Sequence, residues 1–264
     1  MSQSRPTEEA YAELQQAYDF YSLELFKNQL PHCLITFQRL KKTCGYFSRD
    51  RFGRRDGRKT DEIALNPEYF AVVPPVEVLQ TLVHEMTHLW QWHFGKPSRA
   101  CYHNTEWAER MEAIGLMPSS TGGPGGRRVG QKMADYVIAG GKFELATARL
   151  FATGFEITWL DRYPAIPPAR MPSMTKGSSP VSGTGADVSI EQSAGPLPDS
   201  AWIAPSETLA HLVESQKTGN RSNRIKYTCP GCQNNAWGKP KLKLICGDCN
   251  VLLMDDATDT CGHN

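Results

Sequence analysis

Two histidines spaced four residues apart around a glutamate constrain this chain most strongly. They lie in the stretch TLVHEMTHLWQWHFG, residues 81–95, where His84, Glu85 and His88 form the pattern H-E-x-x-H. Each residue of an α-helix turns by about 100°, so residues four apart differ by about 40° and share one face. Two imidazoles in this relation can bind one zinc ion. Glu85 flanks that face without ligating the metal, which suits a general base acting on water.

The alternative is a solvent-exposed helix that merely carries polar residues. The flanking residues are apolar nearly all the way round the helix: Leu82, Val83, Met86, Leu89, Trp90 and Trp92. A helix of this kind is expected to be buried, and buried imidazoles need partners. The stretch therefore favours a metal site.

A catalytic zinc ion takes three protein ligands and keeps one position open, so a third ligand is expected downstream. His103 is the leading candidate, because the loop at 95–100 lets the chain turn back across the metal. Three nearby side chains are rival ligands: Cys101, Glu106 and Glu109. His93 lies about 140° round the helix from His88, which directs it away from the metal.

The spacing of apolar residues and of helix and turn signals predicts helices and short strands in the first 160 residues and one further helix near residue 210. Helices are expected at 7–29, 75–94, 105–114, 145–154 and 206–216, and strands at 33–40, 45–50, 61–67, 135–144 and 155–160. Helices and strands in this order indicate an α+β fold with a small antiparallel sheet.

Residues 164–200 are rich in Pro, Gly and Ser and poor in large apolar side chains. Such a segment cannot bury enough surface to offset the entropy of ordering it, so we expect a linker. The predicted organisation is a main domain at 7–163 with a core at 10–117 and an extension at 118–163, a disordered linker at 164–205, and a C-terminal unit at 206–264 with a short helix.

Four cysteines in the C-terminal unit form two C-x-x-C pairs, Cys229 with Cys232 and Cys246 with Cys249, with thirteen residues between the pairs. Two such pairs are typical of a zinc ribbon, in which four thiolates close a tetrahedral site with no open position. Its zinc is expected to be structural. A redox-active C-x-x-C is the alternative.

The formal net charge is only +1, so electrostatic interactions must come from local clusters. One cluster lies at 39–59 and another at 217–243, where Tyr227 and Trp237 accompany the basic residues. Phosphates would be attracted to both, and the aromatic rings could stack on bases, although solvated surfaces would have the same composition. The candidate nucleic-acid contacts are Arg51, Arg54, Arg55, Arg58, Lys59, Arg224, Lys226, Trp237, Lys239 and Lys241.

The first thirty residues carry charges throughout and lack the apolar run of a secretory signal. No other apolar run has the length needed to cross a bilayer. We therefore expect a cytoplasmic protein without a membrane partner. Paired cysteines in a reducing compartment indicate metal binding rather than disulfides.

The sequence HEMTH, followed by fourteen residues and then HNTEW, resembles the SprT-like metalloprotease domain. The strand-like DEIALNP before the active-site helix also fits that family, and the resemblance covers roughly residues 10–117. It implies a compact zincin-like fold, His84, His88 and His103 as zinc ligands, and Glu85 as the catalytic base. It further implies proteolysis of DNA-bound proteins, notably those crosslinked to DNA.

These observations predict a zinc-dependent endopeptidase with one catalytic and one structural zinc ion, a protein substrate and a DNA partner. Two alternatives remain. One is a regulatory metalloprotease that cleaves a repressor-like partner, similar to the ImmA/IrrE-like proteins, which share H-E-x-x-H but place their further ligand differently. The other is a non-catalytic DNA-binding adaptor whose zinc sites are both structural.

Overall fold

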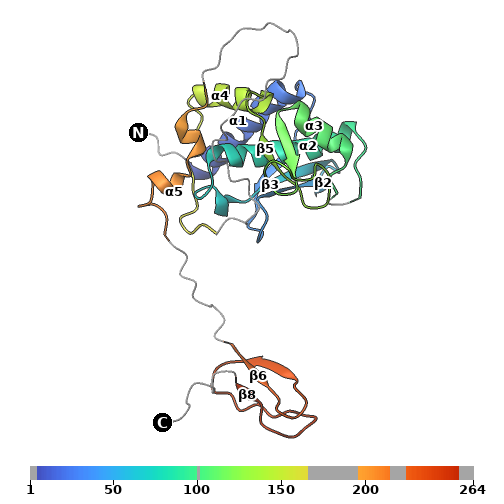
Figure 1. Cartoon of the computed structure of the whole chain (residues 1–264), viewed down its shortest axis with the longest axis vertical. Helices are drawn as coiled ribbons and strands as arrows, with labels where there is room; N and C mark the ends of the chain where they lie inside the picture. Colours follow the sequence, from blue (N-terminus) through green and yellow to red (C-terminus); the bar gives the residue numbers. More distant parts are fainter. Residues whose placement is uncertain (1–4, 100–101, 166–195, 215–223, 256–264) are drawn as a thin grey trace. The chain divides into compact units, whose positions relative to one another are not determined.

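The computed structural model of the chain describes residues 5–99, 102–165, 196–214 and 224–255 (Figure 1). The chain divides into two compact units, Met1–Gln216 and Lys217–Asn264. Within the described ranges, no helix combines the length and the apolar character needed to cross a membrane.

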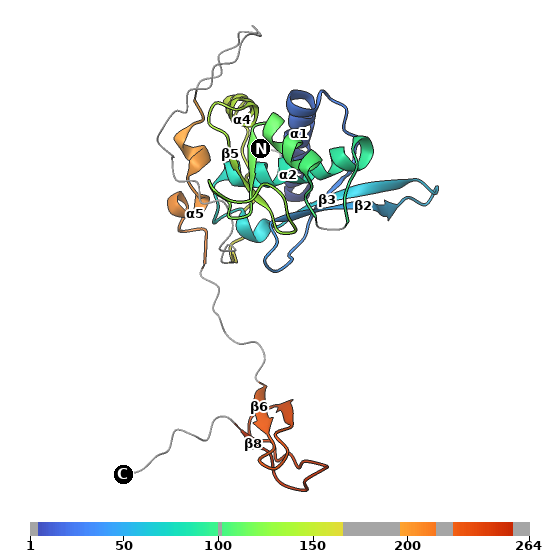
Figure 2. The ribbon, with the colours of Figure 1, turned by 45° about the vertical axis from the view of Figure 1, so that its right-hand side comes forward.

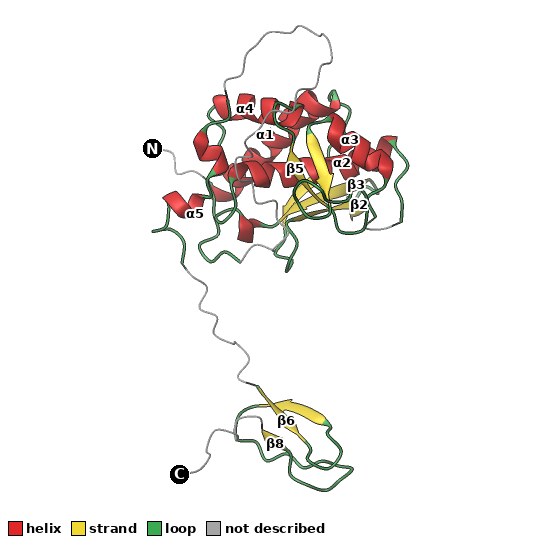
Figure 3. Cartoon of the chain, viewed as in Figure 1, coloured by secondary structure: helices red, strands yellow, loops and turns green. Residues whose placement is uncertain are grey.

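The first unit has an α+β fold, as the sequence predicts (Figure 3). Its elements in chain order are α1 (Pro6–Phe26), β1 (Leu34–Phe37), β2 (Gly45–Gly53), β3 (Lys59–Leu65), η1 (Pro67–Tyr69), α2 (Pro75–Phe94), α3 (Thr105–Ala113), β4 (Leu116–Ser119), β5 (Ala134–Val137), α4 (Lys142–Ala152), η2 (Asp199–Trp202) and α5 (Pro205–Thr208).

Helix α2 is the centre of this unit. Pro75 occupies its first turn, where a missing backbone N–H costs nothing, and the helix ends at Phe94 with Gly95 as its C-cap. It contacts α1, α3, β2 and β3, and its apolar side chains, such as Leu82 and Met86, are fully buried. The helix that carries H-E-x-x-H is therefore held from several sides, as its apolar flanks predict.

The three-stranded sheet has the order β1-β3-β2 and is mixed. Strand β2 pairs with β3 in the antiparallel sense, but β1 pairs with β3 in parallel, with Leu34 opposite Glu62. The expectation of an antiparallel sheet is therefore wrong for this pair. Alternation of apolar residues reports which face of a strand is buried, but not which strand lies beside it.

A second, two-stranded antiparallel sheet pairs β4 with β5, and α4 follows it. The strand expected at 155–160 does not form. This segment runs beside α1 and makes hydrogen bonds to side chains of that helix instead of pairing with a strand. Thr158 donates its backbone N–H to Glu13, and the Trp159 indole donates to Glu9 at 2.7 Å. Without a neighbouring strand edge, β-prone residues there have nothing to pair with.

Residues 196–214, which we call the strap, pack against the rest of the first unit. Leu197 and Ala201 belong to its buried core, and η2 contacts α2. The Ser206 N–H donates to the Ala71 carbonyl at 2.7 Å. The predicted disordered linker at 164–205 is therefore wrong for residues 196–205, and its residues 166–195 lie outside the described ranges.

The far end of the strap is also attached. The backbone N–H of Glu214 donates to the carbonyl of Arg162 at 2.7 Å, and the two side chains form an ion pair. The helix expected at 206–216 is only the four-residue α5. The first unit therefore extends well past residue 205, which the sequence placed at the end of the linker.

The second unit is a small antiparallel sheet with the order β7-β6-β8, formed by β6 (Ile225–Thr228), β7 (Asn235–Gly238) and β8 (Met254–Asp255). Tyr227, Cys229, Cys246 and Leu253 form its buried core. Four buried residues are a very small core, and units of this size normally require a metal or disulfides for stability.

Candidate metal centres and the site around Glu85

Three histidines converge beside α2. His84 and His88 project from successive turns of the helix, and His103 lies just before α3. The Nε2 atom of His103 is 3.3 Å from Nε2 of His84 and 3.0 Å from Nε2 of His88. The sequence prediction of His103 as the third member is therefore matched in space.

The opposite nitrogens of two of these rings have protein partners that set their orientation. His84 Nδ1 lies 2.8 Å from Oδ2 of Asp135, and His103 Nδ1 lies 3.1 Å from the carbonyl oxygen of Gly130. Both partners accept hydrogen bonds, so each Nδ1 carries the proton and each Nε2 presents a lone pair. Gln80 in turn donates to Asp135 Oδ1 at 2.7 Å and fixes the carboxylate.

The electrostatics keep two of the rings neutral. Burial lowers the pKa of His103 to about 3, and burial together with the neighbouring His84 and His103 lowers the pKa of His88 well below its ordinary value. Burial also lowers the pKa of His84, but its hydrogen bond to Asp135 and the charges of Glu85 and Asp135 outweigh that effect and raise the pKa. Neutral imidazoles are the form that binds metal.

The donor set fits a zinc ion. Lone pairs pointing at one another across 3.0–3.3 Å repel, whereas a cation between them would turn this arrangement into an attraction. Zinc–nitrogen distances of 2.0–2.1 Å in a tetrahedral arrangement place the nitrogens about 3.3 Å apart, close to the separations here. His84, His88 and His103 would hold the ion, with Asp135 and Gly130 behind them.

Trp107 of α3 packs against all three imidazoles and is fully buried. Its ring centroid lies 4.4 Å from that of His103, 4.9 Å from that of His84 and 5.3 Å from that of His88. The indole therefore limits the movement of every ligand ring at once and keeps water from that side.

The loop before α3 places His103. Asn104 caps the helix by accepting the N–H of Trp107 at 3.0 Å, and it also accepts from Gln91 of α2 at 2.7 Å. The rival ligand Glu106 accepts from Gln91 and from the Lys96 N–H, so it holds this loop. The rival Glu109 is exposed and does not join the histidines, and Cys101 lies outside the described residues.

Glu85 lies beside the histidines and is 7% exposed. Burial raises the pKa of its carboxyl to about 7, while the nearby His84 and a hydrogen bond from the backbone N–H of Phe47 oppose the rise. A carboxylate that exchanges its proton near neutral pH suits the acid–base role predicted for it. Phe47 belongs to β2, so the edge strand of the sheet reaches the site.

His93 is directed away from the three histidines, as helical geometry predicts. Its Nε2 lies 2.6 Å from Oδ2 of Asp61 on β3. It therefore attaches the end of α2 to the sheet and does not join the metal site.

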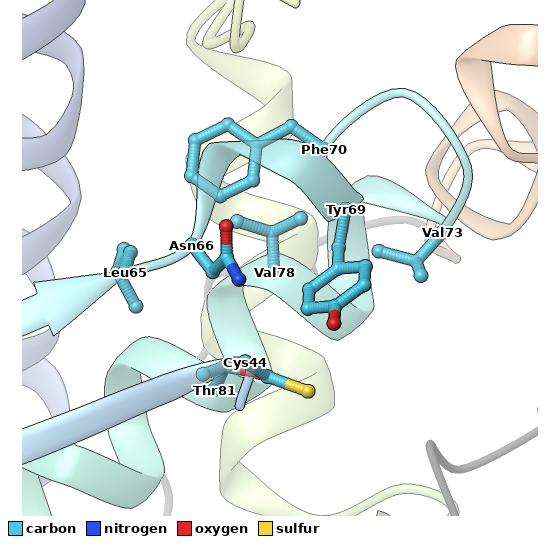
Figure 4. A pocket seen from close by; sticks show the side chains of 8 residues that line it. All are labelled: Cys44, Leu65, Asn66, Tyr69, Phe70, Val73, Val78 and Thr81. Carbon is cyan, nitrogen blue, oxygen red and sulfur yellow. The ribbon is translucent and has the colours of Figure 1, made fainter. Parts of the chain in front are cut away.

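A small cavity lies one turn before the histidines, between α2 and the start of β2 and lined by Cys44, Leu65, Asn66, Tyr69, Phe70, Val73, Val78 and Thr81 (Figure 4). Its volume of about 10 Å³ holds no more than one water molecule. Burial raises the pKa of the Cys44 thiol to about 12, so this cysteine is unreactive. The cavity is too small for a substrate side chain.

The four paired cysteines of the second unit also converge, and their sulfur atoms all lie within 4.8 Å of one another. Two equivalent turns present them, since Gln233 N–H donates to the Cys229 carbonyl and Asn250 N–H donates to the Cys246 carbonyl, both at 2.9 Å. The predicted ribbon cysteines are thus brought together. The donor set fits a closed, structural zinc site.

The basic residues at 49–59 are exposed on the hairpin formed by β2 and β3, which extends from the first unit (Figure 2). Six cations and two carboxylates there leave a charge of +4, from Arg49, Arg51, Arg54, Arg55, Arg58 and Lys59 against Asp50 and Asp56. Asp56 pairs with Arg54 and Arg58, and Arg51 lies 3.7 Å from Glu62. Arg39 is further away and pairs with Asp161.

In the second unit, Arg224, Lys239 and Lys241 are exposed, and Lys226 lies opposite Trp237 on one face of the sheet. The Trp237 side chain is 63% exposed. Tyr227 is 2% exposed, so the expectation that it could stack on bases is wrong. Its hydroxyl instead donates to the Lys239 carbonyl at 2.6 Å.

Sequence reasoning missed Asp135, Gly130 and Trp107, which surround the ligands. Asp135 and Gly130 come from the extension at 118–163, for which the sequence indicated no role. A lone Asp in a short strand carries no recognisable spacing, because its partner is 51 positions away. Trp107, four residues after His103, is a position where helical spacing could have indicated contact.

Comparison with known proteins agrees with this geometry. The model of the SprT-like family matches residues 14–124. A protein of Salmonella typhimurium described as an uncharacterized protein in the mucB 3' region is 59% identical over 59 residues, which are 22% of this chain and 80% of that protein. The search of solved structures gave no significant match.

The SprT-like family is generally a group of zincin-like metalloproteases. Its matched region contains His84, Glu85, His88 and His103, which the fold brings together, whereas Asp135 lies beyond it. Residues 14–124 of this chain form a SprT-like domain.

Proposed function

We propose that the chain is a zinc-dependent endopeptidase that cleaves proteins associated with DNA, including proteins crosslinked to it. The observation that carries the proposal is the convergence of three histidine Nε2 atoms beside a buried carboxylate, Glu85, whose pKa is about 7. Zinc bound there would lower the pKa of a water molecule toward 7 and polarise a peptide carbonyl.

The residues of the chain perform the remaining steps. Glu85 accepts a proton from the attacking water and later transfers it to the leaving amine. The Phe47 N–H orients the carboxylate, and burial allows it to hold and release a proton near neutral pH. Asp135, Gly130 and Trp107 keep the imidazoles in place during these transfers.

Two positively charged surfaces support an association with DNA. The hairpin of β2 and β3 carries three of its six cations in the turn at 54–58, and β2, which leads into this turn, also reaches Glu85 through Phe47. The ribbon presents an exposed Trp237 beside Lys226, a combination suited to stacking on unpaired bases. A nucleic acid held by these residues would bring its bound protein to the peptidase.

The proposal is tested by incubating the full-length protein with zinc and a protein crosslinked to DNA, with the same protein free of DNA as the control. Faster cleavage of the crosslinked substrate, and self-cleavage stimulated by DNA, are expected. Equal cleavage of both substrates would favour the repressor-type peptidase. Absence of cleavage with full zinc occupancy would favour a non-catalytic adaptor.

A further inference from the structure

Strand β2 runs along α2 in close contact. At one end Gly45 faces Thr81, and a Cβ atom on Gly45 would lie 2.8 Å from Thr81 Cγ2, closer than such atoms approach. Two residues later the backbone N–H of Phe47 lies close enough to the Glu85 carboxylate to oppose the rise in its pKa. Glycine at 45 therefore allows the edge strand to lie near enough to the helix for this contact.

Beyond Phe47, two contacts fasten the hairpin to the end of α2. The Arg49 guanidinium lies over the Trp92 ring, 4.3 Å from its centroid. His93 lies 2.6 Å from Asp61 Oδ2, and the second oxygen of Asp61 accepts the Asp50 N–H at 2.7 Å. Asp61 is 6% exposed, so its carboxylate is committed to these partners. We call the pair His93 and Asp61 the hairpin clamp.

Pairing with β3 holds β2 regularly only as far as Ser48. The ladder includes Phe47, and its register shifts between Ser48 and Phe52, where the Asp50 N–H donates to Asp61. The opposite edge of β2 has no strand partner among the described residues. A strand edge with an interrupted ladder is held weakly in position, so contacts to the helix must supply the constraint.

We propose that His93 and Asp61 are positioning residues for Glu85. The hairpin clamp holds β2 against α2, so that the Phe47 N–H stays on the Glu85 carboxylate and directs it toward the reacting water. This inference rests on the proposed role of Glu85 as the base. His93 thereby serves the reaction without binding the metal.

The clamp should affect turnover more than substrate or zinc binding. The hydrogen bonds of the clamp residues go to one another and to the Asp50 N–H rather than to the three histidine ligands, so both zinc sites should fill. A small displacement of the carboxylate lowers the rate of the chemical step, and misplacements of about 1 Å cost on the order of 10- to 100-fold. The His93→Gln variant retains a side-chain N–H donor, so it should keep part of the kcat that His93→Ala loses.

The test uses full-length His93→Ala, His93→Gln, Asp61→Asn and the double variant His93→Ala/Asp61→Asn. Arg149→Ala, which breaks the ion pair between Arg149 and Glu24, is the control. Zinc content, kcat and KM on a fluorophore-labelled denatured protein, and hydrogen exchange at the Phe47 amide are measured for each. The exchange measurement needs no enzymatic activity.

For His93→Ala we expect full zinc content, KM within about twofold and kcat lower by at least about tenfold. Exchange at the Phe47 amide should rise on the order of tenfold. The kcat of the double variant should be no lower than that of the slower single variant, because both substitutions break the same contact. His93→Gln should lie between the wild type and His93→Ala.

Unchanged kcat and unchanged Phe47 exchange in a zinc-loaded His93→Ala variant would overturn the inference. A lower kcat without faster hydrogen exchange at the Phe47 amide would also overturn it. That result would mean that the clamp does not act through the contact between Phe47 and Glu85. Two other results would instead contradict the proposed function. Either the Glu85→Gln variant would retain wild-type activity, or the wild-type protein would have no peptidase activity. In that case the exchange measurement still decides whether the clamp holds Phe47.

Discussion

His84 Nδ1 donates a hydrogen bond to Asp135 Oδ2 across 2.8 Å and so joins the active-site helix α2 to strand β5. These two residues are 51 positions apart, and the segment between them includes α3 and the loop that carries His103. A metal site that looks local in the sequence therefore depends on a segment outside the region matched by the family.

Loss of the Asp135 carboxylate should weaken zinc binding at the histidine site. We expect Asp135→Ala to lower zinc affinity by about 10- to 100-fold, since it removes the acceptor that orients His84. Asp135→Asn should have a smaller effect because its amide oxygen can still accept. Competition with a chelator measures the affinity, and Asp19→Asn, on the exposed face of α1, is the matched control. Wild-type affinity in Asp135→Ala would contradict the orienting role.

Two zinc ions per chain are expected, one in each unit. His103→Ala should remove one equivalent and leave the ribbon site filled, whereas Cys246→Ser should remove the other. Because the ribbon core is so small, loss of its zinc should unfold the second unit alone. Metal analysis and thermal unfolding of each variant check this. Loss of both equivalents in either single variant would show that the sites are not independent.

Binding to duplex DNA should depend on salt through the hairpin of β2 and β3. Arg55→Gln/Lys59→Gln should make the slope of log affinity against log salt less steep by about 2, or roughly one unit per phosphate contact. Arg5→Gln/Lys27→Gln, at the two ends of α1, removes the same charge elsewhere and is the control. Equal slopes for both double variants would mean that the hairpin does not contact phosphates.

The strap should keep the ribbon attached after the chain is cut before it. With a specific protease site inserted near residue 180, the fragment carrying residues 196–264 should co-elute with the peptidase in size exclusion, because Leu197, Ala201 and the Ser206 N–H anchor it. Ala201→Glu should release it, since Ala201 is fully buried and a charge there cannot be solvated.

A site inserted near residue 219, beyond the strap, should release the ribbon in the same experiment and serves as its control. Separation of the fragments after cutting near 180 in the unmodified strap would show that these contacts do not hold it.

Much of this arrangement could be predicted from the sequence because it depends on local spacing. Helical geometry selected His84, Glu85 and His88 and directed His93 elsewhere, and the two C-x-x-C pairs identified the ribbon ligands. His103 can join His84 and His88 only if the loop before α3 turns back toward α2. Tertiary contacts such as that of Asn104 with Gln91 place His103 there, while Glu106 bonds to Gln91 instead.

The features that the sequence did not predict depend on distant partners. The parallel pairing of β1 with β3 and the contact of Asp135 with His84 involve segments with no shared periodicity. The first part of the strap, residues 196–205, falls in the predicted disordered linker because averaged composition hides a few well-placed apolar residues. Tyr227 is a second example. An aromatic residue among lysines suggests nucleic-acid binding, and only the structure shows that its ring is buried.

The most direct measurement of the central claim is the activity of the Glu85→Gln variant with its zinc content. This change keeps the size and shape of the side chain and removes its ability to carry a proton. We predict two zinc ions per chain, unchanged thermal unfolding, and loss of peptide cleavage by at least about 1,000-fold, within the range attributed to acid–base catalysis. Wild-type cleavage in this zinc-loaded variant would contradict the assignment of Glu85 and of the peptidase mechanism.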